Sequence, residues 1–256
     1  MPERPKHSPA FRTWVEALEA RHLADLRVAE VTRALRALSS AYVERRGTVR
    51  DTLDTAGKRA AFALFYAPLH FLTTQLIVRD LQADAPAPRV ILDAGCGTGA
   101  AGAAWAVASH ARSISGVDRH PWAVAEANWT YRHFALAGRA RQGDVGRLRA
   151  PGPGTAVIAA FVLNELPETA RSAVEHRLLE AAGRGHSVLI IEPIARRVAP
   201  WWDDAAARLR SLRGRADEWR FPVDLPPLLR LLDKAAGLDH RELTARSIYC
   251  PGRMAG

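Results

Sequence analysis

The feature that most constrains the fold is a glycine-rich turn between an aliphatic run and an alanine-rich run, in "VILDAGCGTGAAGAAWA", Val90–Ala106. The aliphatic run predicts a buried strand, and the alanine-rich run predicts a helix. Glycines at 95, 97 and 99 allow a tight turn and a close approach to a ligand, because no Cβ is in the way. The stretch therefore predicts a strand–loop–helix unit with a ligand site at the carboxyl end of the strand.

The chain after residue 85 continues this alternation. Short aliphatic or β-branched runs alternate with helical segments, at intervals that suit parallel strands joined by helical crossovers. The expected strands are "RVILDAG", "SISGVD", "RARQGDV", "TAVIAAFVL", "SVLIIEP" and "LDHRELTARSIY", and the expected helices cover about 99–110, 120–137, 167–182 and 225–236. We expect an α/β fold, a Rossmann-like doubly wound and mostly parallel sheet with helices on both faces. Whether a seventh, antiparallel strand exists stays open.

The N-terminal part is predicted to be all helical. Residues 11–46 carry apolar side chains at helical spacing opposite arginine and glutamate, and a further helical run spans about 55–83, with a kink expected at Pro68. We expect a helical N-terminal segment, 1–84, and an α/β domain, 85–256, with an insertion at about 196–222. The helical segment and the insertion are expected to cover the substrate side as a lid.

Composition narrows the class of protein. The net charge is +9, nearly all of it from arginine, which favours a polyanionic partner; a GC-rich coding sequence would produce the same excess. Two cysteines exclude a disulfide framework and a CxxC metal site, and a buried or bystander thiol is the favoured interpretation of each. We see no acidic cluster for a metal, no apolar run close to the length of a membrane span and no signal peptide, so we expect a cytoplasmic protein.

The spacing of the glycine loop distinguishes between nucleotides. Dinucleotide-binding proteins use GxGxxG, whereas this loop has GxGxG with Asp93 two residues before its first glycine, and no Walker lysine follows. A carboxylate at that position would repel a pyrophosphate. It can instead accept a hydrogen bond from the ammonium group of a methionine moiety.

At these residues the chain resembles the class I S-adenosylmethionine-dependent methyltransferases. Asp118 in "SGVD" stands where that family has an acid that binds both ribose hydroxyls, and Asp144 in "QGDV" stands at the place of the residue that meets the adenine amine. The alternatives from the residues alone are an N-cap for Asp118 and a turn cap for Asp144. The resemblance implies S-adenosylmethionine as cofactor, contacted by Asp93, Ala94, Gly95, Cys96, Gly97, Gly99, Asp118, Arg119, Asp144, Val145 and Phe161.

The acceptor side is expected at "AAFVLNELPETAR", where the fourth strand ends. Its NELP segment is not the Asn/Asp-Pro-Pro-aromatic tetrad of exocyclic-amine methyltransferases, and no cysteine nucleophile for carbon-5 pyrimidine methylation is present there. Asn164, Glu165 and Glu192 are the catalytic candidates. A capping or backbone-bonding role is an equal alternative for the two glutamates.

Aromatic residues among arginines are the candidates for substrate contact, because such side chains stack on bases and meet phosphates. They are Tyr66, His70, Trp201, Trp202 and Trp219. The alternative for aromatics at helical spacing is the core, which we expect for the neighbouring Phe62 and Phe65.

Residues 31–195 also resemble a narrower family, the methyltransferase-like proteins associated with the small ribosomal subunit of mitochondria and bacteria. The similarity lies in "LRALSSAYVERRG", "AAFALFYAPLHFLTTQLIVRDL", "AFVLNELPETAR" and "VLIIEP" around the glycine loop. It implies RNA or the small ribosomal subunit as partner. The chain departs from that family afterwards, since Cys250 has no cysteine-rich surroundings. A small-molecule methyltransferase and a non-catalytic, cofactor-binding assembly factor remain alternatives.

Overall fold

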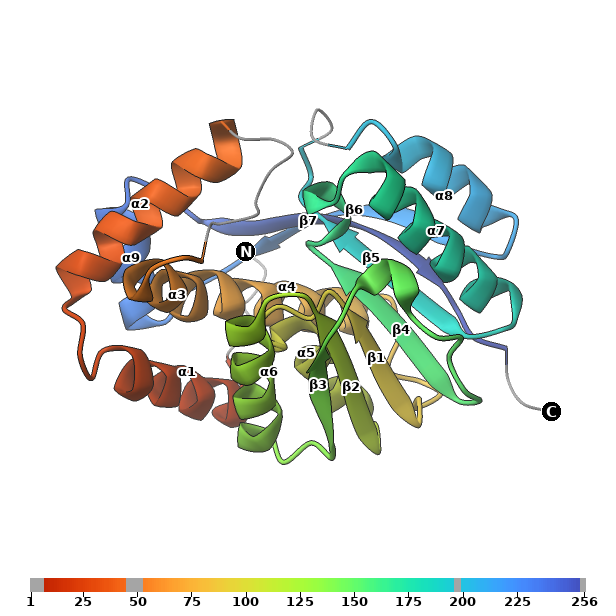
Figure 1. Ribbon diagram of the computed structural model, residues 1–256, viewed down its shortest axis with the longest axis horizontal. Coiled ribbons are helices and arrows are strands. Elements are labelled where there is room, and N and C mark those ends of the chain that lie inside the picture. Colours follow the sequence, from red (N-terminus) through yellow and green to blue (C-terminus); the bar gives the residue numbers. More distant parts are fainter. Residues whose placement is uncertain (1–6, 45–52, 196–198, 254–256) are drawn as a thin grey trace. The chain divides into compact units, whose positions relative to one another are not determined.

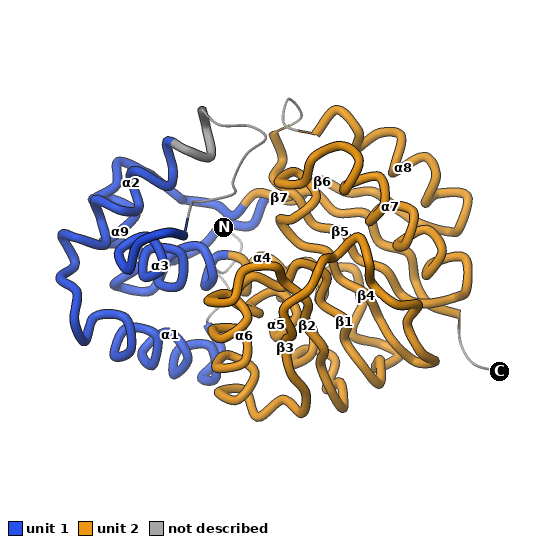
Figure 2. Tube along the Cα trace, viewed as in Figure 1, with its two compact units in different colours: residues 1–69, 220–243 blue, residues 70–219, 244–256 orange. Residues whose placement is uncertain are grey.

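The computed structural model describes residues 7–44, 53–195 and 199–253. The chain divides into two compact units (Figure 2): residues 1–69 with 220–243, and residues 70–219 with 244–256. This corrects the expected division at residue 84. The segment 220–243 joins the N-terminal helices because its helix packs on them, and a pairing between segments so far apart in sequence leaves no local pattern.

The first unit is built from helices. They are α1 (Pro9–His22), α2 (Val28–Glu44), α3 (Ala56–Ala61), the π-helical turn η1 (Phe62–Tyr66), the start of α4 (Ala67–Asp80) and α9 (Pro227–Ala235). The apolar side of α9 packs on α2 and η1, and the guanidinium of Arg36 donates through Nε to the carbonyl of Ala235 at 3.0 Å. Gly237 follows α9 with φ +77°, as expected for a left-handed helix end.

The helix expected to kink at Pro68 continues through that proline. In a regular α-helix the ring of Pro68 would clash with the carbonyl of Leu64. Leu64 lies in the wider π-helical turn η1, which directly precedes α4 and relieves that clash. The combined run Ala56–Asp80 is long and apolar enough to cross a membrane by length and composition, contrary to our expectation from the sequence. Its most apolar 18-residue window is 78% buried inside the protein, as in the core helix of a globular domain.

The second unit is built on a seven-stranded sheet (Figure 1). The strands are β1 (Val90–Ala94), β2 (Ser113–Asp118), β3 (Gly138–Gln142), β4 (Thr155–Ala160), β5 (Ser187–Glu192), β6 (Arg215–Pro222) and β7 (Glu242–Cys250). Their order is β3-β2-β1-β4-β5-β7-β6, with β1 to β5 parallel and β7 antiparallel to β5. The expected mostly parallel, Rossmann-like sheet is confirmed, and a seventh, antiparallel strand is present.

Helices cover this sheet unevenly. Those of the unit are most of α4, then α5 (Ala100–Ser109), α6 (Pro121–His133), α7 (Glu168–Gly183) and α8 (Trp202–Arg210). Helix α5 packs on β1 and β2, α6 packs on β2 and β3, and α7 packs on β5 and α8. The connection from β3 to β4 holds only a short 3-10 turn, η2 (Val145–Arg147). The order of the strands places the carboxyl ends of β1, β2 and β4 side by side, where a ligand site is expected.

The expected insertion at 196–222 is corrected by the structure. The described part of that segment forms α8 and β6, so it completes the sheet rather than interrupting it. Leu209 and Trp202 of α8 lie in the hydrophobic core beside Val188 of β5. The sequence hides both elements because charged residues fill the exposed side of α8 and the edge strand β6.

Candidate functional site

The glycine loop between β1 and α5 closes onto the end of β2. The amides of Gly95 and Cys96 both donate to the carbonyl of Val117, at 2.9 and 3.0 Å. The amide of Gly97 donates to Oδ2 of Asp118 at 2.9 Å. The carboxylate of Asp118 therefore holds the middle of the loop.

Asp118 does not cap α6. Its Oδ1 accepts from the amide of His120 at 2.8 Å, and His120 is the N-cap residue, with its ring nitrogen facing the amide of Ala123 at 3.4 Å. The N-cap alternative for Asp118 is therefore not observed. The carboxylate instead ties the loop after β1 to the loop after β2.

The surroundings of Gly95 and Gly97 show why the loop needs glycine at these positions. Gly97 has φ +50°, and a Cβ built on it would meet no atom within 4 Å, so that side of the loop is open. A Cβ on Gly95 would lie 2.3 Å from the side chain of Val162, so the loop packs directly against the turn after β4. The loop thus forms a cradle with one open side, at the carboxyl ends of β1, β2 and β4.

Asp93 lies beneath this cradle. Its side chain is 1% exposed, and its Oδ2 accepts from the amide of Gly102 in the first turn of α5 at 3.1 Å. Burial raises the pKa of Asp93 to about 7, although the Gly102 amide opposes that shift. Cys96 is also buried in the loop, in line with the bystander role expected for it, and burial raises the pKa of its thiol.

Asp144, the third acid predicted to contact the cofactor, lies just after β3. Oδ1 of Asp144 accepts from the amide of Gly146 at 2.8 Å, so Asp144 caps the turn η2, as the alternative interpretation held, while its side chain stays exposed. Val145 is buried beside it. Arg119 is exposed after β2, and its carbonyl accepts from the side-chain amide of Gln142 at 3.1 Å.

Residues 91–184 match the family model of a methyltransferase domain. The chain is an S-adenosylmethionine-dependent methyltransferase. The match covers the strands and loops from β1 to the end of α7, which include the glycine loop and the turn after β4. No curated protein matches the chain.

Solved structures are similar to this chain at low sequence identity. The methyltransferase domain of a bacterial Hen1 is 13% identical, over 71% of this chain and 99% of that one, with a TM-score of 0.50. A TehB-like S-adenosylmethionine-dependent methyltransferase from Corynebacterium glutamicum is 18% identical, over 70% of this chain and 88% of that one, with a TM-score of 0.45.

The residues of the cradle fit S-adenosylmethionine. The open side of Gly97 leaves room for a ligand against the backbone, and the Asp118 carboxylate lies at the end of the neighbouring strand. Asp93 is buried beneath the loop and its Oδ2 is engaged by the amide of Gly102, so its carboxylate does not lie on the open side of the cradle. When bound, the cofactor supplies a methyl group on an already activated sulfonium, so the protein has chiefly to align the acceptor and exclude water.

The acceptor-side turn η3 (Leu163–Glu165) is held from β5. Oε1 of Glu192 accepts from the amides of Leu163 and Asn164, at 2.7 and 3.4 Å. Glu192 is fully buried, and burial raises the pKa of its carboxyl to about 8. The expected backbone-bonding alternative is observed for Oε1, while Oε2 has no hydrogen-bond partner among the described residues.

Asn164 is oriented by Trp201. The indole Nε1 of Trp201 donates to Oδ1 of Asn164 at 3.1 Å, which leaves the amide nitrogen of Asn164 as the remaining donor. That nitrogen is buried and has no partner in the described part of the chain. The arrangement can donate a hydrogen bond to an oxygen or ring nitrogen of an acceptor, whereas the carbonyl oxygen is already engaged. Glu165 is half-buried in the same turn.

The predicted substrate residues fall into different surroundings. His70 stacks on Phe161 with ring centroids 4.0 Å apart, and burial lowers the pKa of His70 to about 3, so its ring is neutral. Phe161 has φ +57°, a strained value for a phenylalanine, at the end of β4. The structure thus brings a predicted cofactor residue and a predicted substrate residue into contact.

The tryptophans lie deeper than the sequence suggested. Trp201 and Trp202 are 8% and 6% exposed, and the guanidinium of Arg246 lies over the Trp202 ring at 4.3 Å, so little of either ring is left for a base to stack on. Trp219 is half-buried on β6, and its Nε1 donates to Oγ of Ser247 at 2.9 Å. Tyr66 lies in η1 of the first unit, where burial raises its pKa to about 12.

Sequence reasoning missed the residues that support the loop from below. Gly116 of β2 leaves room for the Tyr131 hydroxyl and the Cys96 thiol, which would lie 2.6 and 2.8 Å from a Cβ there. An isolated glycine within a strand signals such a close approach, so "SISGVD" held a usable signal. The sequence holds no signal for the hydrogen bond between Trp201 and Asn164, because the two residues come together only through the packing of α8.

Proposed function

We propose that this methyltransferase acts on RNA in the cytoplasm, with small-subunit rRNA as its acceptor. The observation that carries the proposal is the net charge of +9, which favours a polyanionic acceptor over a small neutral one. The resemblance of residues 31–195 to methyltransferase-like proteins of the small ribosomal subunit supports the same acceptor. The amide nitrogen of Asn164, a donor without a partner among the described residues, suits a nucleobase, whose edge carries carbonyl oxygens and ring nitrogens.

A second candidate is a cofactor-binding assembly factor without catalysis. The observation that favours it is the role of Glu192. This buried acid holds the turn η3 through Oε1, which is a structural role and not that of a catalytic base. A base is required only for some acceptors, since the methyl donor is already activated. The two candidates therefore differ in methyl transfer and not in cofactor binding.

The test is transfer of a labelled methyl group from S-adenosylmethionine to immature 30S particles from a deletion strain. The proposal expects label in the small-subunit rRNA, and much less with the Asp118→Ala variant when S-adenosylmethionine is kept below the Kd of that variant. Label that appears only in the small-molecule fraction of a cell extract would contradict an RNA acceptor. Bound cofactor without any transfer would favour the assembly factor.

A further inference from the structure

One face of the sheet in the second unit has no helix over its β2 and β3 part. Helices α5 and α6 cover one side of β1, β2 and β3, while α7 lies over the part of the sheet around β4 and β5 (Figure 1). On the other side of β2 and β3, the connection that would carry a further helix, residues 143–154, holds only the turn η2. Of the five residues of β3, only Ala140 is buried.

The register shows which side chains occupy this uncovered side. Ala140 is the register partner of Gly116, and a Cβ on Gly116 would lie 2.6 Å from the hydroxyl of Tyr131 in α6, so Ala140 faces the helices. Side chains alternate along a strand, so Arg139 and Arg141 point to the opposite side. Leu92, Ser115 and Arg139 are register partners across β1, β2 and β3, and they form one row on that side. We name the part of this surface beyond Leu92, which itself packs toward α7, the open face; its residues are Ser113, Ser115, Arg139, Arg141 and Arg149.

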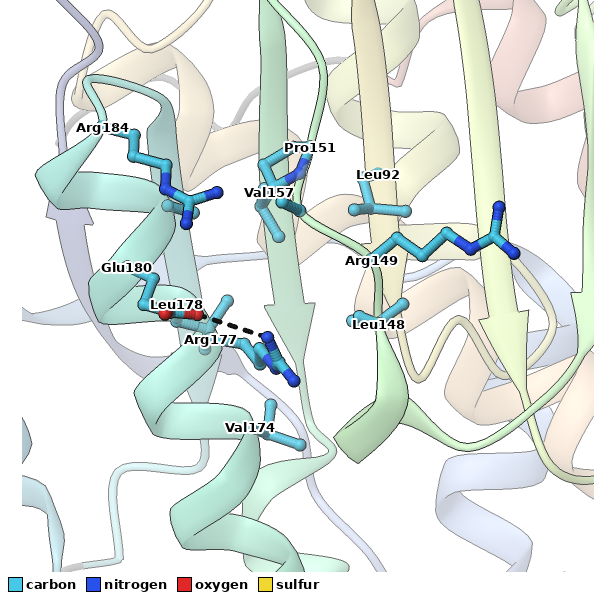
Figure 3. Close-up of a pocket in the computed structure, with 12 residues that line it drawn as sticks. Leu92, Leu148, Arg149, Pro151, Val157, Val174, Arg177, Leu178, Glu180 and Arg184 are labelled. Atoms are coloured by element: carbon cyan, nitrogen blue, oxygen red, sulfur yellow. Dashed lines mark hydrogen bonds and ion pairs between the residues drawn. The ribbon is translucent and has the colours of Figure 1, made fainter.

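Arg149 joins the open face from the loop after η2. Figure 3 shows the hollow between this loop and α7, which Leu92, Val157 and Leu178 line together with arginines at its rim. The side chain of Arg149 extends away from α7, while that of Arg184 lies on α7 (Figure 3). Arginine side chains therefore continue from the β3 edge to α7.

The arginines of the open face lack acidic partners. Arg139, Arg141 and Arg149 are exposed, and none of them forms an ion pair with a described residue. The nearby acids are engaged elsewhere, since Glu180 pairs with Arg177 at 3.4 Å and Asp144 lies 3.8 Å from Arg147. Like charges gathered without counter-charges repel one another, and a polyanion removes that repulsion.

We propose that the open face binds the phosphate backbone of RNA. The identity of the polyanion as RNA rests on the function proposed above. Arginine presents a planar fork of donors that matches phosphate oxygens, and serine hydroxyls donate to the same oxygens. Strands β1, β2 and β3 carry no aromatic residue, so this face suits backbone contact rather than base stacking.

The experiment compares two double variants that each remove two positive charges. Arg139→Ala/Arg141→Ala changes the open face, and Arg12→Ala/Arg210→Ala changes exposed arginines of α1 and α8. The probe is a fluorescein-labelled single-stranded RNA oligonucleotide, with anisotropy measured from about 50 to 200 mM salt, the range over which phosphate contacts change affinity strongly. The open-face variant should bind at least about tenfold more weakly at low salt, with a salt slope smaller by about 2. The control should stay within about twofold of the wild type.

Other outcomes overturn the proposal in distinguishable ways. Equal losses in both variants would mean that charge acts diffusely, and an unchanged affinity in the open-face variant would remove this surface while leaving RNA as the acceptor. A wild type that binds no RNA even at low salt would contradict the proposed function itself. Binding to vesicles of acidic phospholipid in place of RNA would assign the face to a membrane surface. Unchanged affinity for S-adenosylmethionine confirms that the variants fold.

Discussion

The Asp118 carboxylate joins two loops and is also expected to contact the cofactor. It accepts hydrogen bonds from the amides of Gly97 and His120, and these bonds set the shape of the loop on which the cofactor is expected to lie. Its position at the end of β2 could be predicted from the sequence, because "SGVD" ends a strand just before a proline that starts a helix. Its bond to Gly97 could not, since the two residues meet only when β1 and β2 pair.

Asp118→Ala should weaken S-adenosylmethionine binding by about 2 kcal/mol, which is about 30-fold in Kd, as expected for the loss of charge-assisted hydrogen bonds. Calorimetry measures the affinity, and circular dichroism checks that the sheet remains. Asp144→Ala is the control at the exposed end of the site. It should weaken S-adenosylmethionine binding by less than Asp118→Ala does, because the Asp144 carboxylate is more solvated. An unchanged Kd in Asp118→Ala would remove this residue from the site.

At the scale of elements, the acceptor-side turn η3 depends on a buried acid from the next strand. Glu192 and Asp93 both have raised pKa values, about 8 and about 7, because both are buried. The folded protein therefore keeps protons that the unfolded chain has already released at these pH values. The contribution of these two groups to stability is complete at low pH and falls as the pH rises from about 4 to about 7 for Asp93 and to about 8 for Glu192, by up to about 1.4 kcal/mol per pH unit for each group.

Glu192→Gln should flatten that dependence. Glutamine keeps a carbonyl oxygen for the amides of Leu163 and Asn164 but cannot ionise, so the variant should gain stability relative to the wild type as the pH rises from 5 to 8. Urea unfolding at three pH values across this window measures the difference. Glu16→Gln, at an exposed position of α1, should follow the wild type. A parallel profile for Glu192→Gln would mean that Glu192 is ionised throughout the range.

The elements from β1 to β5 could be predicted because their strands, apart from the polar edge strand β3, are apolar and alternate regularly with helical segments. β6 could not, because an edge strand buries little and "RADEWRFP" carries four charges. Helix α8 was hidden for the same reason, and with it the burial of Trp201 and Trp202. Tryptophans beside acids and arginines suggested an exposed platform, whereas the rings fill the core and only their polar neighbours face solvent.

At the scale of the whole molecule, the sequence predicted two parts but not their composition. The helix α9 belongs with helices more than 150 residues earlier in the chain, as its contacts with α2 show. The sequence shows that α9 has an apolar face, but it does not show which element packs against that face. The net charge was equally visible, while the placement of the unpaired arginines on one uncovered sheet face follows only from strand order and register.

The central claim is that the cradle at the ends of β1 and β2 binds a sulfonium nucleoside. Calorimetry of the full chain with S-adenosylmethionine and, separately, with NADH tests it most directly, with Gly97→Val as the variant that fills the open side of the loop. We predict that S-adenosylmethionine binds the wild type and not the variant, and that NADH binds neither. Binding of NADH by the wild type, or of S-adenosylmethionine with equal affinity by Gly97→Val, would contradict it.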